Sequence, residues 1–198
     1  MNTRVIIGIF AAIVIGGVVY WYMDSQYILY ENESIGFTVE IPKSWVASTT
    51  KAVYSWEGDV LTLRSSEFSE KEYTYEDIIR TVSTTIPTSG ASFSIPFKEE
   101  SRVSEDISTP QLYSEWILSS NQKCSNCSGS QVVSLSGQPA VVYDIRGSVG
   151  TETSETTRII KTLKDGREFR INYYAADGST EQNQEIFRRF ISTFTFTK

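Results

Sequence analysis

The sequence predicts an α+β fold, in which helices pack on an antiparallel sheet and one transmembrane helix precedes the domain. Three observations support this prediction. Short segments of alternating apolar and polar residues recur along the chain, which is typical of strands with one buried face. Two longer segments carry apolar residues at helical spacing. Residues 5–23 form a run without charge that precedes all of these segments.

The run at residues 5–23 has the length and composition of a transmembrane helix. At about 1.5 Å of rise per residue it would extend roughly 28 Å, close to the ~30 Å hydrocarbon core of a bilayer. Tyr20, Trp21 and Tyr22 lie at its end, where aromatic rings favour the membrane interface. A cleaved signal peptide would end in small residues, and a lipoprotein would need a cysteine there, whereas the first cysteine is Cys124. We therefore predict an uncleaved anchor.

The charges that flank this run predict its orientation. Arg4 precedes it, whereas Asp24, Glu31 and Glu33 follow it. Because positively charged flanks stay in the cytoplasm, we expect a cytoplasmic N-terminus and a C-terminal domain outside the cytoplasm. The predicted parts are a transmembrane anchor at residues 1–23, a tether at residues 24–33, and an extracytoplasmic domain at residues 34–198 with a loop insertion near residues 89–130.

The composition excludes several classes of function. The chain has 198 residues and a formal net charge of −6, whereas a nucleic-acid-binding protein needs a basic surface to neutralise phosphates. It contains no histidine, which is the commonest general base and metal ligand. A Ser-His-Asp or Cys-His mechanism and a histidine-ligated zinc site are therefore excluded. We expect contact with the membrane through the N-terminal helix and no binding of nucleic acid.

Alternating segments predict the strands. Phe37, Val39 and Ile41 share one face of a strand over residues 35–42. Asp165-Gly166 supplies the positive φ angles of a tight hairpin turn. That turn joins strands over residues 156–163 and 168–175. We predict a second hairpin, with strands over residues 53–56 and 60–63 and a turn at residues 57–59. Further strands are predicted over residues 93–97, 131–135, 140–146 and 193–198.

Helical spacing of apolar residues predicts two helices. The first runs over residues 74–86, with a threonine as its N-cap. The second covers residues 180–193 and carries an apolar stripe, with Arg188 and Arg189 facing water. Residues 112–118 fit either a short helix or a strand.

Short motifs at both ends of the domain resemble those of PsbP-like domains. Gly36-Phe37 opens a predicted strand that ends at Pro42 and is followed by Trp45. Residues 137–140 read Gly-Gln-Pro-Ala before a later strand. Residues 191–196 read Ile-Ser-Thr-Phe-Thr-Phe. The resemblance covers most of residues 30–198 and implies an α/β/α sandwich around an antiparallel sheet. In photosynthetic members the domain is an accessory of a membrane complex, whereas membrane-anchored bacterial members are mostly of unknown role. The chain thus resembles a membrane-anchored member of the bacterial type.

Cys124 and Cys127 form a C-x-x-C pair in a segment rich in Ser, Asn and Gly. Zinc needs four ligands, and the chain has neither a second cysteine pair nor histidine. A thiol-redox site would place its cysteine at a helix N-terminus, where the helix dipole lowers the thiol pKa. Because compartments outside the cytoplasm favour disulfides, we predict a disulfide between the two cysteines and keep a thiol-redox module as an alternative.

Acidic residues are abundant but form no recognised motif. Glycoside hydrolysis needs two carboxylates across a cleft, and calcium needs a loop rich in oxygen ligands. The sequence contains no such calcium loop and no phosphate-binding glycine motif. We therefore predict a solvated surface for three acidic pairs, which are Glu99 and Glu100, Glu105 and Asp106, and Glu152 and Glu155.

These patterns predict a non-enzymatic accessory or interaction domain, without catalytic residues, cofactor or metal, that meets a protein partner at the membrane surface. Four aromatic residues are candidates for the contact surface, although core packing is the stronger expectation for them; they are Phe93, Phe97, Tyr113 and Trp116. A ligand-binding or carboxylate-based enzymatic domain is the alternative. A pocket lined by close carboxylates with shifted pKa values would favour it.

Overall fold

The structure is a computed structural model that describes residues 26–51, 59–76, 81–97, 106–149, 153–175 and 181–197. The predicted anchor at residues 5–23 lies outside these ranges. Of the helices in the described part of the chain, none has both the length and the apolar character that spanning a bilayer requires.

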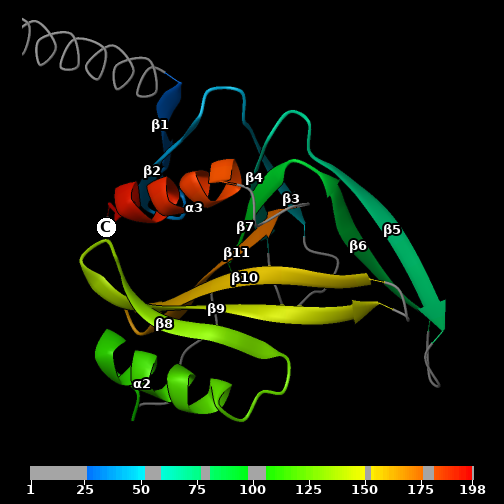
Figure 1. The fold of residues 1–198 in the computed structure, drawn as a ribbon. Helices are drawn as coiled ribbons and strands as arrows, with labels where there is room; N and C mark the ends of the chain where they lie inside the picture. Colours follow the sequence, from blue (N-terminus) through cyan, green and yellow to red (C-terminus); the bar gives the residue numbers. More distant parts are fainter. Residues whose placement is uncertain are drawn as a thin grey trace, which may run out of the picture.

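Figure 1 shows the helices and strands of the domain in chain order. The strands are β1 (Tyr27–Asn32), β2 (Phe37–Pro42), β3 (Val46–Lys51), β4 (Asp59–Arg64), β5 (Ser69–Glu76), β6 (Thr81–Ser89), β7 (Ala91–Phe97), β8 (Cys127–Leu135), β9 (Gln138–Val149), β10 (Thr153–Lys164), β11 (Arg167–Ala175) and β12 (Thr195–Phe196). The helices are α2 (Pro110–Asn121) and α3 (Glu181–Thr193). The pairs of neighbouring strands among the described residues are antiparallel, which confirms the predicted α+β class.

The described strands divide among three sheets, rather than the one sheet that the sequence predicts. The largest sheet has the order β3-β4-β7-β11-β10-β9-β8. A small sheet has the order β1-β2-β12, so that the two ends of the domain pair with one another. β5 and β6 form a separate two-stranded sheet.

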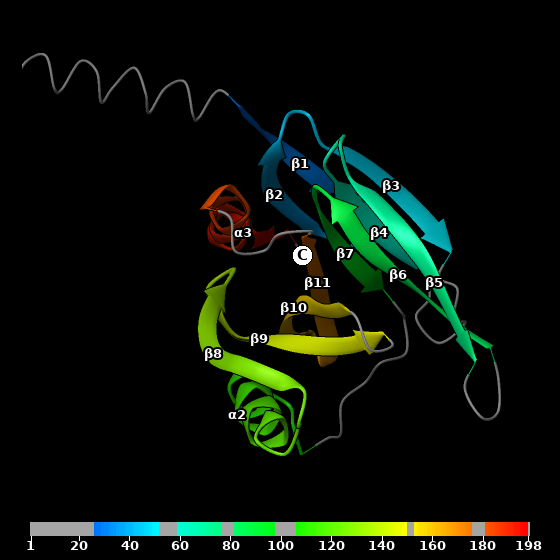
Figure 2. The same ribbon diagram turned by 45° about the vertical axis from the view of Figure 1, so that its right-hand side comes forward.

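Helices cover both faces of the large sheet, as Figures 1 and 2 show. Side chains alternate along a strand, and in β9 Val141 packs in the α2 cluster whereas Val142 packs in the larger core. Tyr113 and Ile117 of α2 form the smaller cluster with β9 and β10. The larger core lies on the opposite face, beneath α3 and the small sheet. The layers are thus helix, sheet and helix, as the resemblance implies.

Phe93 lies at the centre of the larger core. It is fully buried on β7, between β4 and β11. Its ring centroid is 3.7 Å from that of Phe190 on α3, 4.7 Å from that of Tyr173 on β11 and 5.7 Å from that of Trp45. Phe93 therefore joins the helix to the sheet, which confirms core packing for this aromatic residue.

Several predicted elements are confirmed in detail. Phe37, Val39 and Ile41 are buried on one face of β2. Asp165 and Gly166 have φ angles of 52° and 75° and turn the chain between β10 and β11. A tight hairpin turn requires such positive φ angles, as the sequence predicts. α3 and β12 also match their predicted positions, and α2 settles residues 112–118 as helix.

The helix predicted over residues 74–86 is wrong. Residues 74–76 of this segment belong to β5 and residues 81–86 to β6, whereas residues 77–80 lie outside the described part of the chain. The two strands pair from Glu70 with Pro87 to Glu76 with Thr81. The apolar spacing that suggests a helix is also compatible with strand alternation. Residues 81–86 consist mostly of Thr, Val and Ile, and these β-branched side chains favour strands over helices.

Two predicted segments at the start of the domain also need correction. The tether predicted over residues 24–33 is wrong for β1, which pairs along its whole length with β2. β4 is confirmed and pairs with β3 at Val46–Lys51 and with β7, whereas the hairpin partner predicted for it, residues 53–56, lies outside the described part of the chain. In both places the alternation is weak, because the strands lie at sheet edges where polar residues are tolerated.

The described part of residues 89–130, for which the sequence predicts a loop insertion, contains β7, α2 and the start of β8. β7 is an inner strand of the large sheet, and α2 covers one face of that sheet. The strand predicted at residues 93–97 is thereby confirmed. That the segment is an insertion stays a prediction.

Candidate functional site

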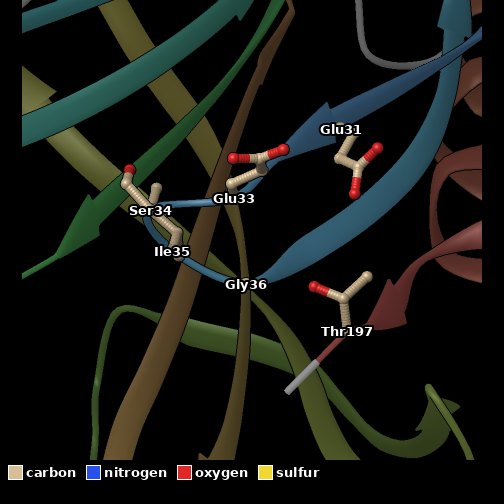
Figure 3. Close-up of a pocket in the computed structure, with 6 residues that line it drawn as sticks. All are labelled: Glu31, Glu33, Ser34, Ile35, Gly36 and Thr197. Carbon is tan, nitrogen blue, oxygen red and sulfur yellow. The ribbon is translucent and has the colours of Figure 1, made fainter.

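An acidic pocket of about 350 Å³ lies at the turn between β1 and β2 (Figure 3). The residues that line it are Glu31, Glu33, Ser34, Ile35, Gly36 and Thr197. Thr197 comes from the end of the chain, because pairing of β12 with β2 brings the two ends of the domain together. Its backbone N–H donates to the carbonyl oxygen of Gly36 at 2.9 Å.

Asn32 shapes the turn that forms this pocket. Its side-chain oxygen accepts hydrogen bonds from the Ser34 hydroxyl and from the Ile35 N–H, each at 2.9 Å. The Gly36 N–H donates to the Asn32 carbonyl oxygen at 2.8 Å. Gly36 has a φ angle of 80°, which a residue without a side chain adopts most readily. These contacts close the turn before β2 enters the core.

The chemistry that this pocket offers is limited. Glu31, Glu33 and Ser34 are exposed to water, so their oxygens can accept hydrogen bonds from a cation or an amine. Ligand sites are usually apolar clefts with a few convergent polar groups, whereas here only Ile35 supplies an apolar side chain. The described residues contain no group of three His, Cys, Asp or Glu side chains that could hold a metal ion. The pocket is therefore acidic and largely polar, and the enzymatic alternative stays a prediction.

A polar network fastens α2 to the large sheet. The Tyr113 hydroxyl donates a hydrogen bond to Glu168 on β11, and Lys161 on β10 lies 3.0 Å from the other carboxylate oxygen of Glu168. Burial and the hydrogen bond to Glu168 raise the pKa of Tyr113 far above its usual range. The neutral phenol is therefore the stable form, and it acts as a donor that holds the helix in register.

A second ion pair lies on the opposite face of the sheet. Arg158 on β10 donates to Asp144 on β9 through Nε at 2.8 Å and through Nη2 at 3.2 Å. Its guanidinium also stands 4.8 Å from the centre of the Phe187 ring. Burial raises the pKa of the adjacent Tyr173, whose hydroxyl donates to the Asn183 carbonyl oxygen at 2.9 Å. These contacts join α3 to β9, β10 and β11. The Arg158 guanidinium, the Asp144 carboxylate and the Tyr173 hydroxyl therefore each have a structural partner within the domain.

Arg189 does not face water in the way that the helical pattern predicts. Its Nη2 lies 2.7 Å from a carboxylate oxygen of Glu40 on β2, and its guanidinium stands 4.1 Å from the centre of the Tyr27 ring on β1. Arg188, in contrast, is exposed and pairs with Glu185 on the same helix. Arg189 therefore ties the small sheet to α3, which periodicity alone did not reveal.

Cys124 and Cys127 are close enough for the predicted disulfide, with 2.07 Å between the sulfur atoms. Cys124 follows the C-terminal end of α2, and Cys127 begins β8. A thiol at a helix C-terminus faces the negative end of the dipole, which does not lower its pKa. The position that the thiol-redox alternative needs, a helix N-terminus, is therefore not the position that these cysteines occupy.

The four candidate contact aromatics separate into different environments. Phe93 and Tyr113 are fully buried, and the side chain of Phe97 lies outside the described part of the structure. Trp116 is 47% exposed on α2, and Leu112, one helical turn earlier, is 44% exposed. Core packing, which was the stronger expectation for all four residues, is therefore wrong for Trp116, and no sequence pattern indicated Leu112 beside it.

Each of the three acidic pairs includes at least one residue outside the described part of the chain, so their solvated surface stays a prediction. Asp106 is exposed, and Glu155 lies near the start of β10. The residues outside the described ranges are Glu99, Glu100, Glu105 and Glu152. The acidic pocket at the β1–β2 turn was missed because its residues come from both ends of the domain.

Comparisons with known proteins give similarity to solved structures. No protein-family model matches the chain, and no curated protein matches it. Among solved structures, the chain is similar to the solution structure of cyanobacterial PsbP (CyanoP) from Synechocystis sp. PCC 6803. The two share 13% sequence identity with a TM-score of 0.48, over 86% of this chain and 92% of that chain.

Proposed function

We propose that the chain is a non-enzymatic interaction domain, displayed on the outer face of a membrane by its N-terminal helix. The observation that carries the interaction part of this proposal is the outward apolar surface of α2. Leu112 and Trp116 form this surface, which we call the α2 patch.

The α2 patch lies beside the face of the helix that is already buried, about 100° away around the helix axis, because Leu112 directly precedes Tyr113 and Trp116 directly precedes Ile117. Tyr113 and Ile117 fill the core beneath α2, and the Trp116 ring centroid lies 5.9 Å from that of Tyr113. Trp116 and Leu112 nevertheless remain 47% and 44% exposed, so the domain covers only part of each side chain. Tryptophan is enriched in the energetically dominant centres of protein interfaces. Two apolar side chains one turn apart match the footprint of a partner that covers the helix.

The membrane part of the proposal rests on the uncharged run at residues 5–23 and on the charges that flank it. The motifs that resemble PsbP-like domains support an accessory role, since photosynthetic members of that family serve a membrane complex. We therefore include membership of the PsbP-like family in the proposal, as a membrane-anchored member of the bacterial type.

Photocrosslinking in membranes of the source cells tests the interaction. A photoreactive amino acid at Glu115, which is exposed beside Trp116, is expected to give a discrete crosslinked protein. The same probe at Thr49, which is exposed on β3, provides the matched control. The substitutions Leu112→Ala and Trp116→Ala together are expected to abolish the product from position 115. Equal products from both positions, or a product that survives the double substitution, would count against the proposal.

A further inference from the structure

β1 carries two consecutive apolar residues that the domain does not fully bury. Ile28 is 43% exposed and lies on the same face of the small sheet as the buried Ile41, whereas Leu29 is 67% exposed and points to the other face. Their exposure follows from position, because β1 is the edge strand of the small sheet and has a partner on one side only. Val46, which follows the turn after β2, is also exposed. β1 and this turn lie at the same end of the domain, at the top of Figure 1.

The chain between the predicted anchor and β1 is very short. Only residues 24–26 separate the end of the uncharged run from Tyr27. Three residues extend by at most about 11 Å. The headgroup layer on each side of a bilayer is about 5–8 Å thick, by difference between the ~40–45 Å total and the ~30 Å core. β1 therefore has to begin at or immediately above the headgroups if the anchor spans the membrane.

The structure provides no slack that would lengthen this connection. Tyr27 already pairs with Pro42, and the Lys43 N–H donates to the Gln26 carbonyl oxygen at 2.8 Å. Arg189 holds the Tyr27 ring from the α3 side. Lengthening the connection by unpairing the start of β1 would break these contacts. If the anchor spans the membrane, the folded sheet therefore starts at the membrane surface.

We propose that β1 is a membrane-contact strand, whose Leu29 side chain enters the interfacial layer of the lipid bilayer. This inference rests on the proposed membrane placement and deepens it, because it states which face of the domain meets the lipid. The partner is the lipid surface rather than a protein, since the three-residue connection keeps the start of β1 within about 11 Å of the end of the membrane-spanning run, which is at or just above the headgroup layer.

The charges along β1 agree with this orientation. Lys43 is exposed beside the start of the strand, where it faces the lipid phosphates in the proposed orientation. Glu31 and Glu33 lie at the far end, about 7–13 Å beyond Leu29 at the rise of a strand. Apart from Asp24, which directly follows the uncharged run, this arrangement keeps the carboxylates of Glu31 and Glu33 away from anionic headgroups. The acidic pocket then opens on the side away from the bilayer.

Nitroxide accessibility in liposomes tests the contact. The full chain carrying Leu29→Cys is labelled without reductant, so that the Cys124–Cys127 disulfide stays closed, and is reconstituted in phosphatidylcholine with a minor share of phosphatidylglycerol. The parent chain, treated identically, measures background labelling. The matched control is Val132→Cys, because Val132 is 53% exposed and lies on β8 at the edge of the large sheet. Collision with oxygen reports lipid, and collision with a water-soluble nickel chelate reports solvent.

We expect the label at position 29 to collide several-fold less with the nickel chelate, and more with oxygen, than the label at position 132. Equal collision rates at the two positions, in protein that resists alkaline carbonate extraction, would overturn the lipid contact and leave the anchor standing. Protection of position 29 from both reagents would mean that protein covers the strand, which also overturns the inference. Release of the chain by carbonate would overturn the proposed anchor, and the lipid contact with it.

Discussion

Replacing Phe93 with alanine is expected to lower the free energy of unfolding by about 3–5 kcal/mol, the usual range for a large aromatic residue removed from a core. The ring is fully buried and stacks on Phe190 at 3.7 Å between centroids, with Tyr173 and Trp45 also in contact. Because β7 lies in the interior of the large sheet, neighbouring strands cannot move inward to fill the cavity. The total free energy of unfolding of such a domain is only about 5–15 kcal/mol, so the substitution removes a large share of it.

Urea unfolding followed by circular dichroism measures this loss, with the full chain kept in mild detergent. Leu29→Ala is the matched control, since its side chain is 67% exposed and its removal is expected to change stability by no more than about 0.5 kcal/mol. A loss below about 1 kcal/mol for Phe93→Ala would contradict the packing of α3 on β7.

The domain is also expected to lose stability steeply above pH 10. Burial raises the pKa of Tyr113, Tyr143 and Tyr173 in the folded chain, and Glu168 raises that of Tyr113 further. A tyrosine in the unfolded chain ionises near pH 10. Each raised pKa therefore contributes stability that is fully present below pH 10 and is lost as the pH rises toward the folded-state value. The expected slope is about 1.4 kcal/mol per pH unit for each tyrosine that stays neutral.

The variant Tyr113→Phe separates this effect from other alkaline changes. At neutral pH it is expected to cost about 1–3 kcal/mol, because Glu168 loses a buried donor. Above pH 10 its free energy of unfolding should fall less steeply than that of the parent, by about 1.4 kcal/mol per unit. Urea titrations at closely spaced pH values provide both slopes. Identical slopes in the two proteins would show that Tyr113 is not held neutral by the fold.

Elements that are determined by neighbouring residues could be predicted from the sequence, whereas elements that depend on distant segments of the chain could not. The β10–β11 hairpin was predictable because Asp165-Gly166 and the flanking alternation act locally. The structure of residues 74–86 was not predictable in this way, because their apolar spacing is compatible with both a helix and a strand. The pairing of β5 with β6 decides between the two. β1 was mistaken for a tether, since an edge strand needs few buried side chains.

The candidate surfaces were predictable to different extents. The Cys124–Cys127 pair could be proposed from spacing alone, because both cysteines lie in one short segment. The α2 patch was recognised only in part, since Trp116 and the buried Tyr113 look alike without the orientation of the helix. The acidic pocket and the contact between Arg189 and Tyr27 join segments that are far apart in the chain. No local pattern marks such contacts before the sheet order is known.

The most direct test of the membrane placement is a pair of reporter fusions to the C-terminus of the full chain, expressed in a bacterial host. Alkaline phosphatase becomes active only after export, whereas green fluorescent protein fluoresces when it folds in the cytoplasm. With Arg4 before the uncharged run and Asp24 after it, we expect an active phosphatase fusion, a dark fluorescent fusion, and retention of both in carbonate-washed membranes. A bright fluorescent fusion with an inactive phosphatase fusion, or recovery of the intact chain in the soluble fraction, would contradict the placement.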